Sequence, residues 1–393
     1  MMAHVSVSFR SPTFIPIAVV VFFMAAWHAV MPYAALYASS LGMSVGQIGV
    51  LFSTQVAASF VASVAGMRWV DAFSPSALAV SASLAGSGSM LLMAVRPDPR
   101  AAFLGLAVFG TAQTIMSVAC QVVIARHTKS EQYVRIWAVY SFFTSLAMVC
   151  GPVLGAASIF LAGSVRGPFF VAAGFSAVAG TLAWFIRDDA QSKLPPTGRL
   201  LASLRAVPPP VHHGLITVAI AEFCYAGWVT FFPLLLKTAG QAEEVVGLLF
   251  ALSGIATTAI RPILTQVILS VSQSRIIALS FVLLALGSGF ALGPAFLPLA
   301  VLASLCFGLG FGLVFPMTLV LVTAPAPSEL ASQLLGARLF MGKLGQMLGP
   351  PLLSLFAQLH LAAALVAVGT ISAAMVPWIL TRGHPYGSSK LNR

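Results

Sequence analysis

Charged residues are scarce in this chain. Only 7% of its 393 residues are Asp, Glu, Lys or Arg, whereas a soluble domain carries about 25%. Hydrophobic residues make up 59% of the chain, and the mean hydropathy is +0.99. Too few polar residues remain to cover a surface in contact with water. The composition therefore excludes an ordinary soluble domain and predicts a membrane protein.

Cysteine and acidic residues are also few. The four cysteines lie inside apolar runs at unrelated spacings, so we expect no disulfide, no metal site and no cofactor: Cys120, Cys150, Cys224 and Cys306. The net charge of +11 does not indicate nucleic-acid binding, because Lys and Arg do not cluster with interleaved aromatic residues. Gly342-Lys343 is followed by Leu344 where a phosphate-binding loop has Ser or Thr, and no HExxH motif occurs. We therefore expect a protein that is not an enzyme.

Long apolar runs are abundant. A bilayer core of about 30 Å needs roughly 20 apolar residues per helical crossing. Uninterrupted Leu, Val, Ala and Phe stretches favour helices over the alternating segments of a β-barrel. The sequence predicts twelve spans at about 14–37, 47–67, 76–95, 101–124, 137–161, 167–186, 214–236, 245–269, 276–294, 297–323, 335–357 and 361–381.

The distribution of Lys and Arg predicts the orientation, because these residues accumulate in cytoplasmic loops. With the amino terminus inside, fourteen of the twenty fall on the cytoplasmic side: Arg10, Arg68, Arg126, Lys129, Arg135, Arg187, Lys193, Arg199, Arg205, Arg275, Arg338, Arg382, Lys390 and Arg393. Arg261 and Lys343 lie within apolar spans instead. We expect a multi-pass protein of the inner membrane with both termini in the cytoplasm.

Two halves of the chain repeat each other. Ala25-Ala26-Trp27 and Pro32 recur 201 residues later as Ala226-Gly227-Trp228 and Pro233. Further matches occur at an offset of 198: Gly49-Val50-Leu51-Phe52 with Gly247-Leu248-Leu249-Phe250, Phe109-Gly110 with Phe307-Gly308, and Gly151-Pro152 with Gly349-Pro350. The change of offset predicts a loop three residues shorter between the first two helices of the second half. Such parallel repeats are typical of transporters.

The repeats predict four regions. We expect six-helix bundles at 1–187 and 214–382, a Pro-rich cytoplasmic linker at 188–213 and a cytoplasmic tail at 383–393. Two parallel six-helix repeats joined by a cytoplasmic loop resemble the major facilitator superfamily over essentially the whole chain. The resemblance implies a secondary transporter that works by alternating access and carries a small molecule.

Two motifs of that superfamily have counterparts here. Asp71 fits the loop motif between the second and third helices, although Ser74 and Pro75 stand where glycine and basic residues are usual. Gly151-Pro152-Val153-Leu154-Gly155 resembles the fifth-helix motif of exporters, especially proton-coupled antiporters. Close packing of Gly151 and Gly155 against a neighbouring helix is the alternative explanation. The copy at Gly349-Pro350 in the second half favours this packing role over a role in the direction of transport. The arginine that such antiporters carry in the fourth helix is replaced by Leu106.

Ionisable residues inside spans indicate a functional site, because a charge near the bilayer centre costs at least about 2.5 to 3.5 kcal/mol. Glu222 is the one acidic residue well inside a predicted span, and a carboxyl there is a natural proton carrier. Lys343 and Arg261 could neutralise Glu222 or bind an anionic substrate. Arg261 could also extend its side chain to the interface. His28, four residues before Pro32, is a second candidate for proton coupling.

Other side chains are candidates for the wall of a substrate cavity. Gln113 and Gln121 can form hydrogen bonds with a substrate, whereas packing in the core is the alternative for the aromatic residues Trp27, Trp228, Tyr225 and Phe231. The favoured hypothesis is a monomer in the lipid bilayer that exports a drug or metabolite against proton entry. Uptake or exchange of an organic anion or sugar is the alternative, and an intramembrane enzyme a remote one.

Overall fold

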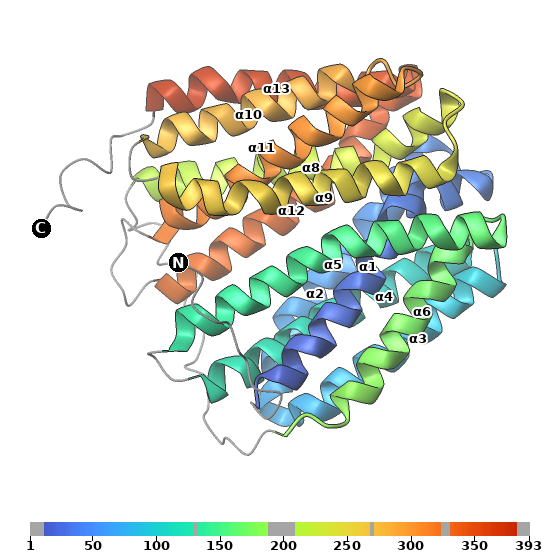
Figure 1. Cartoon of the computed structure of the whole chain (residues 1–393), viewed down its shortest axis with the longest axis vertical. Helices are drawn as coiled ribbons and strands as arrows, with labels where there is room; N and C mark the ends of the chain where they lie inside the picture. Colours follow the sequence, from blue (N-terminus) through green and yellow to red (C-terminus); the bar gives the residue numbers. More distant parts are fainter. Residues whose placement is uncertain (1–11, 129–131, 188–208, 268–270, 324–330, 383–393) are drawn as a thin grey trace, which may run out of the picture. The chain divides into compact units, whose positions relative to one another are not determined.

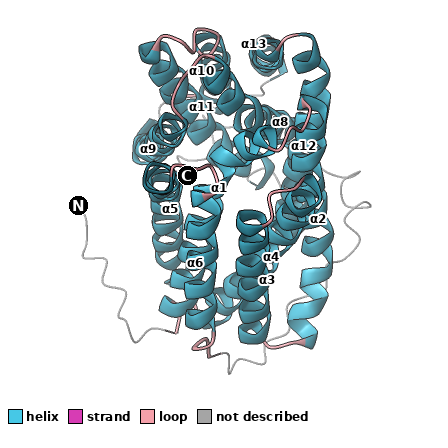
Figure 2. Cartoon of the chain, turned by 90° about the vertical axis from the view of Figure 1, so that its right-hand side faces the viewer, coloured by secondary structure: helices cyan, strands magenta, loops and turns pink. Residues whose placement is uncertain are grey.

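The computed structural model describes residues 12–128, 132–187, 209–267, 271–323 and 331–382. These residues form twelve α-helices, and no strand occurs among them (Figure 2). Ten of the described helices are long and apolar enough to cross a membrane. The expectation of an all-α membrane protein with about twelve helices is confirmed.

Two described helices fall outside those ten for different reasons. Helix α6 (Gly167–Ala183) is apolar but has only 17 residues. Helix α12 (Ala331–Leu359) has 29 residues but is more polar, because Arg338, Lys343 and Gln346 interrupt its apolar sequence. A span that tolerates such residues places them against protein or a cavity rather than against lipid.

The chain divides into two compact units. Unit 1 comprises Met1–Met43, Thr54–Leu194 and Glu243–Ala251, and unit 2 comprises Ser44–Ser53, Pro195–Ala242 and Leu252–Arg393. Residues 188–208 of the expected linker lie outside the described residues, as does the expected tail at 383–393. The next helix begins at Pro209, five residues before the expected start of the second bundle.

In Figure 1 most of unit 1 is coloured from blue to green and most of unit 2 from yellow-green to red. Unit 1 contains α1 (Phe14–Ser40), most of α2 (Val45–Ala72), α3 (Pro75–Val95), α4 (Pro99–His127), α5 (Tyr133–Ala162) and α6. Unit 2 contains α8 (Pro209–Thr238), most of α9 (Glu243–Val267), α10 (Gln273–Phe290), α11 (Leu297–Thr323), α12 and α13 (Leu361–Arg382).

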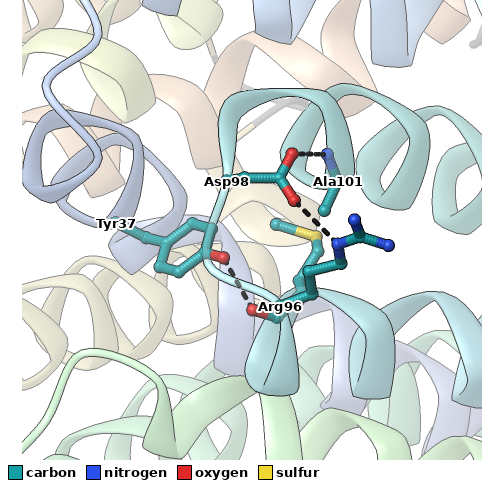
Figure 3. A network of polar contacts seen from close by, with 5 residues as sticks. Tyr37, Arg96, Asp98 and Ala101 are labelled. Atoms are coloured by element: carbon teal, nitrogen blue, oxygen red, sulfur yellow. Dashed lines mark hydrogen bonds and ion pairs between the residues drawn. The ribbon is translucent and has the colours of Figure 1, made fainter.

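Side-chain caps and proline define two helix starts. Ser74 and Asp98 accept hydrogen bonds from the backbone N–H groups of Ala77 and Ala101, and proline occupies the first position of α3 and of α4. Figure 3 shows Asp98 also paired with Arg96, with 3.3 Å between Arg96 Nε and Asp98 Oδ2. The Tyr37 hydroxyl donates to the carbonyl oxygen of Met93, 2.6 Å away, and so ties α1 to the end of α3.

Equivalent glycines allow the same close approach in both halves. A Cβ on Gly110 of α4 would lie 2.6 Å from Ser59 Oγ on α2. Residues 59 and 110 correspond at the offset of 198 to Thr257 and Gly308, and the Thr257 hydroxyl donates to the Gly308 carbonyl oxygen at 2.9 Å. A repeat found in the sequence therefore corresponds to a repeated helix contact.

The Gly-Pro segments of α5 and α12 also pack alike. A Cβ on Gly151 would lie 2.8 Å from the Ala25 carbonyl oxygen of α1, and one on Gly155 would lie 2.6 Å from the Ala29 carbonyl oxygen. In unit 2, a Cβ on Gly349 would lie 2.8 Å from the carbonyl oxygen of Phe223 on α8. These glycines therefore let a helix backbone touch its neighbour directly.

The expectation of a shorter loop in the second half is wrong. Gly42 and Gly240, 198 residues apart, both have positive φ, at 75° and 81°, in turns with matching backbone hydrogen bonds. The turns are thus the same length. The three missing residues lie in the helix, because α1 continues from Pro32 to Ser40 whereas α8 ends at Thr238, soon after Pro233.

Candidate functional site

A buried polar cluster joins α8 to α12 in unit 2. Glu222 is only 7% exposed, and its Oε2 accepts a hydrogen bond from Gln346 Nε2 at 2.7 Å. Lys343 Nζ donates to Gln346 Oε1 at 3.3 Å. The Gln346 amide therefore connects the acidic and the basic side chain that the sequence singled out.

Glycines of α12 allow this helix to approach α8 closely. Gly342, Gly345 and Gly349 are spaced three and four residues apart, so they share one helix face. A Cβ on Gly345 would clash with the carbonyl group of Ala219 on α8, and one on Gly342 would lie 3.4 Å from Glu222 Cγ. The absence of side chains on this face brings Gln346 within hydrogen-bond distance of α8.

Arg338 is a third charged member that the sequence interpretation missed. Its place on the cytoplasmic side stays a prediction; in α12 its side chain is only 4% exposed. Its guanidinium donates to Thr318 Oγ1 and to the Phe315 carbonyl oxygen, at 3.1 and 2.8 Å, and lies 4.3 Å from the Phe315 ring centroid. The sequence did contain a signal for this burial, because Arg338 lies three residues inside a span predicted to begin at residue 335.

The carboxylate of the cluster has no ion-pair partner among the described residues. Lys343 and Arg338 both interact with Glu222 electrostatically, but the polar partner that touches its carboxylate is the neutral Gln346 amide. Arg261, in α9, is not among the charges that act on Glu222. The structure therefore brings Lys343, but not Arg261, to the acidic residue.

Aromatic residues beside the cluster differ in exposure. Tyr225 of α8 stacks on Phe311 of α11 with 4.4 Å between the ring centroids, and both are partly exposed. Trp228 is 1% exposed and lies between Phe232 and Phe307, at 3.9 and 4.2 Å between centroids. Tyr225 thus keeps part of its side chain exposed, whereas Trp228 belongs to the core of unit 2.

The remaining cavity candidates lie in unit 1. The Trp27 ring stacks on Phe109 at 5.7 Å, and the neighbouring His28 packs its Cβ close to Gly151. Gln113 Nε2 lies 3.9 Å from the sulfur of Met24, and Gln121 Nε2 donates to the Tyr140 hydroxyl at 3.0 Å. Asp71 lies in the last turn of α2, and its side chain is outside the described residues.

The fold and the polar cluster define a class of protein. Two halves with repeated helix contacts, and charged side chains buried within one of them, are features of membrane transporters. The chain matches the Major Facilitator Superfamily over residues 17–350. It therefore belongs to that superfamily of transporters.

Solved structures share the fold at low sequence identity. A nucleoside transporter, NupG, is 12% identical, with a TM-score of 0.77 over 94% of this chain and 97% of its own. A peptide transporter, POT, is 13% identical, with a TM-score of 0.77 over 95% of each chain. The human organic anion transporter MFSD10 is 17% identical, with a TM-score of 0.64 over 94% of this chain and 99% of its own. A comparison with curated protein sequences finds no match.

Proposed function

We propose that this transporter exports a small organic molecule in exchange for protons by alternating access, with Glu222 as the proton carrier. The observation that supports it is the environment of Glu222, a buried carboxylate held by a neutral amide rather than by an ion pair among the described residues. A buried carboxylate without a directly bound cation is readily neutralised by a proton. Alternate occupation by proton and substrate then couples the two movements.

The direction of transport rests on the α5 motif. Gly151-Pro152 and Gly155 resemble the exporter motif of the superfamily, and both glycines pack directly on α1. The distribution of Lys and Arg supports an inner-membrane location with both termini in the cytoplasm. We propose that the transporter works as a monomer.

A second candidate function is proton-driven uptake, or exchange, of an organic anion. The two cations near Glu222, Lys343 and Arg338, favour it because they attract negative charge. The name of the structurally similar human organic anion transporter agrees with this class of substrate. An anion and a proton bound to one cluster stabilise each other, so they would move together. Export in exchange for protons requires instead that they exclude each other.

The two functions predict pH changes of opposite sign. Proteoliposomes with an acidic lumen and a trapped pH indicator would receive pools of nucleosides, peptides and organic anions. Exchange makes the lumen more alkaline when a substrate enters, whereas cotransport makes it more acidic. Glu222→Gln should abolish either response but leave substrate exchange, while Glu244→Gln, in the first turn of α9, serves as the matched control. An unchanged response in Glu222→Gln would refute Glu222 as the proton carrier.

A further inference from the structure

Three aromatic rings follow one another beside the charged cluster. Tyr225 and Phe311 are nearly parallel, with 19° between their planes, and Phe315 lies one helical turn along α11, 6.3 Å from Phe311 between centroids. Tyr225 and Phe311 are partly exposed, and Phe315 is 39% exposed. The stacked pair of Tyr225 and Phe311, with Phe315 tilted by 43° to Phe311, presents flat apolar area that another flat ring can cover.

Arg338 holds the last ring of this row in place. Its guanidinium covers one side of Phe315, while its donors are bound to Thr318 and to the Phe315 carbonyl oxygen. The exposed part of Phe315 therefore belongs to a ring that is fixed on its other side. A fixed ring is a better platform for a ligand than a mobile one, because less conformational entropy is lost on binding.

Lys343 supplies a positive charge with spare donors. An ammonium group has three N–H donors, and the bond to Gln346 Oε1 uses one of them. Within the described cluster, Lys343 and Arg338 carry two positive charges against the single negative charge of Glu222. A cation in the membrane interior without a directly bound carboxylate is stabilised by an anionic ligand.

We infer that this ring-and-lysine face, made of Tyr225, Phe311, Phe315, Lys343 and Gln346, binds an organic anion that carries a flat aromatic ring. The ring of the ligand covers the aromatic row, and its carboxylate or similar anionic group pairs with Lys343. The inference rests on the proposed function in taking this cluster as the substrate site, and it favours the second candidate function, because an anion and a proton bound to one cluster stabilise each other.

The test compares three ligands of nearly equal size with the purified full-length protein in lipid nanodiscs. The probes are 2-naphthoate, its neutral analogue 2-naphthamide, and the non-aromatic anion decahydronaphthalene-2-carboxylate, with binding measured by calorimetry. We expect 2-naphthoate to bind about tenfold more tightly than the amide and about threefold to tenfold more tightly than the saturated acid. Equal binding of the naphthoate and the amide, or no binding of any probe, would overturn the inference.

Two variants assign the contacts. Lys343→Met should weaken the two anions but not the amide, whereas Phe311→Leu should weaken the two aromatic probes but not the saturated acid. Lys237→Met, at the end of α8, and Phe296→Leu, at an exposed phenylalanine outside the site, are matched controls. Equal loss of all three probes in Lys343→Met would mean a structural role and would contradict the assignment. Thermal unfolding of each variant verifies that it is folded.

The same preparation separates this inference from the proposed function. If the probes show no preference but Glu222→Gln still abolishes the pH response to a substrate pool, the inference fails and the proposed function stands. If the preference is found but Glu222→Gln leaves the pH response unchanged, the proton-carrier role fails and the ligand class stands.

Discussion

Replacing Gly345 by Ala tests whether the close contact between α8 and α12 builds the polar cluster. The added Cβ would collide with the Ala219 carbonyl group and lie 3.1 Å from its Cα, so the helix backbones must separate. Overpacking of this kind costs about 1–3 kcal/mol, while Ala in place of Gly in a helix recovers at most about 1 kcal/mol. Because the obstacle is backbone rather than a flexible side chain, we expect a net loss of about 2 kcal/mol in the free energy of unfolding.

The expected loss of stability can be measured directly, and it should also reduce transport. For a unit of this size it corresponds to a melting temperature lower by roughly 4 to 8 °C, measured by thermal unfolding in detergent. Gln346 follows Gly345 directly, so separation of the helices also stretches its 2.7 Å bond to Glu222. Substrate-induced pH change in proteoliposomes should therefore fall as well.

A matched control is available in the same unit. Gly289 lies in α10, and a Cβ added there would meet no atom within 4 Å, so Gly289→Ala should leave both readouts near the parent values. If Gly345→Ala melts like the parent protein and retains the pH response, the argument that glycine packing positions Gln346 is refuted.

Three further changes test individual contacts. Gln346→Leu removes the hydrogen bonds to both charged partners. We expect a melting temperature lowered by an amount that matches about 1.5–3 kcal/mol for each lost bond, together with reduced transport. Transport like that of the parent protein would contradict a bridging role. Arg338→Lys should also lower the melting temperature, because lysine lacks the planar fork that binds Thr318 while lying over a ring; full stability of this variant would argue against that geometry. Gly151→Ala should destabilise unit 1 by about 1–3 kcal/mol. Gly174→Ala, where an added Cβ meets nothing within 4 Å, should not. Equal melting temperatures of the two variants would count against direct packing of α5 on α1.

The repeat shows how far the sequence predicts packing. Glycines at an offset of 198 make corresponding helix contacts, because small residues, glycine above all, let two helix backbones approach closely. The position of the missing residues was not predictable in this way. A change of offset states only that three residues are absent somewhere between Pro233 and Gly247, and the hydrogen-bonded turn at Gly240 is what places them in the helix.

The charged cluster could likewise be predicted only in part from the sequence. Scarcity of charge made Glu222 and Lys343 conspicuous, since an ionisable residue in an apolar span has a high cost unless it has a partner. Their connection through Gln346 depends on the rotation of α8 against α12, and that rotation depends on which glycines face Ala219 and Glu222.

Composition and hydrophobic run length determined by themselves that this chain is a helical membrane protein, because the bilayer imposes one length and one polarity on every span. The recurring Gly, Pro and Trp positions determined that it has two related halves. Only the tertiary structure decided which side chains meet. It buried Arg338 against Phe315, placed Trp228 in the core and left Tyr225 partly exposed. Such differences arise from helix rotation and neighbour shape, on which hydropathy along a sequence carries no information.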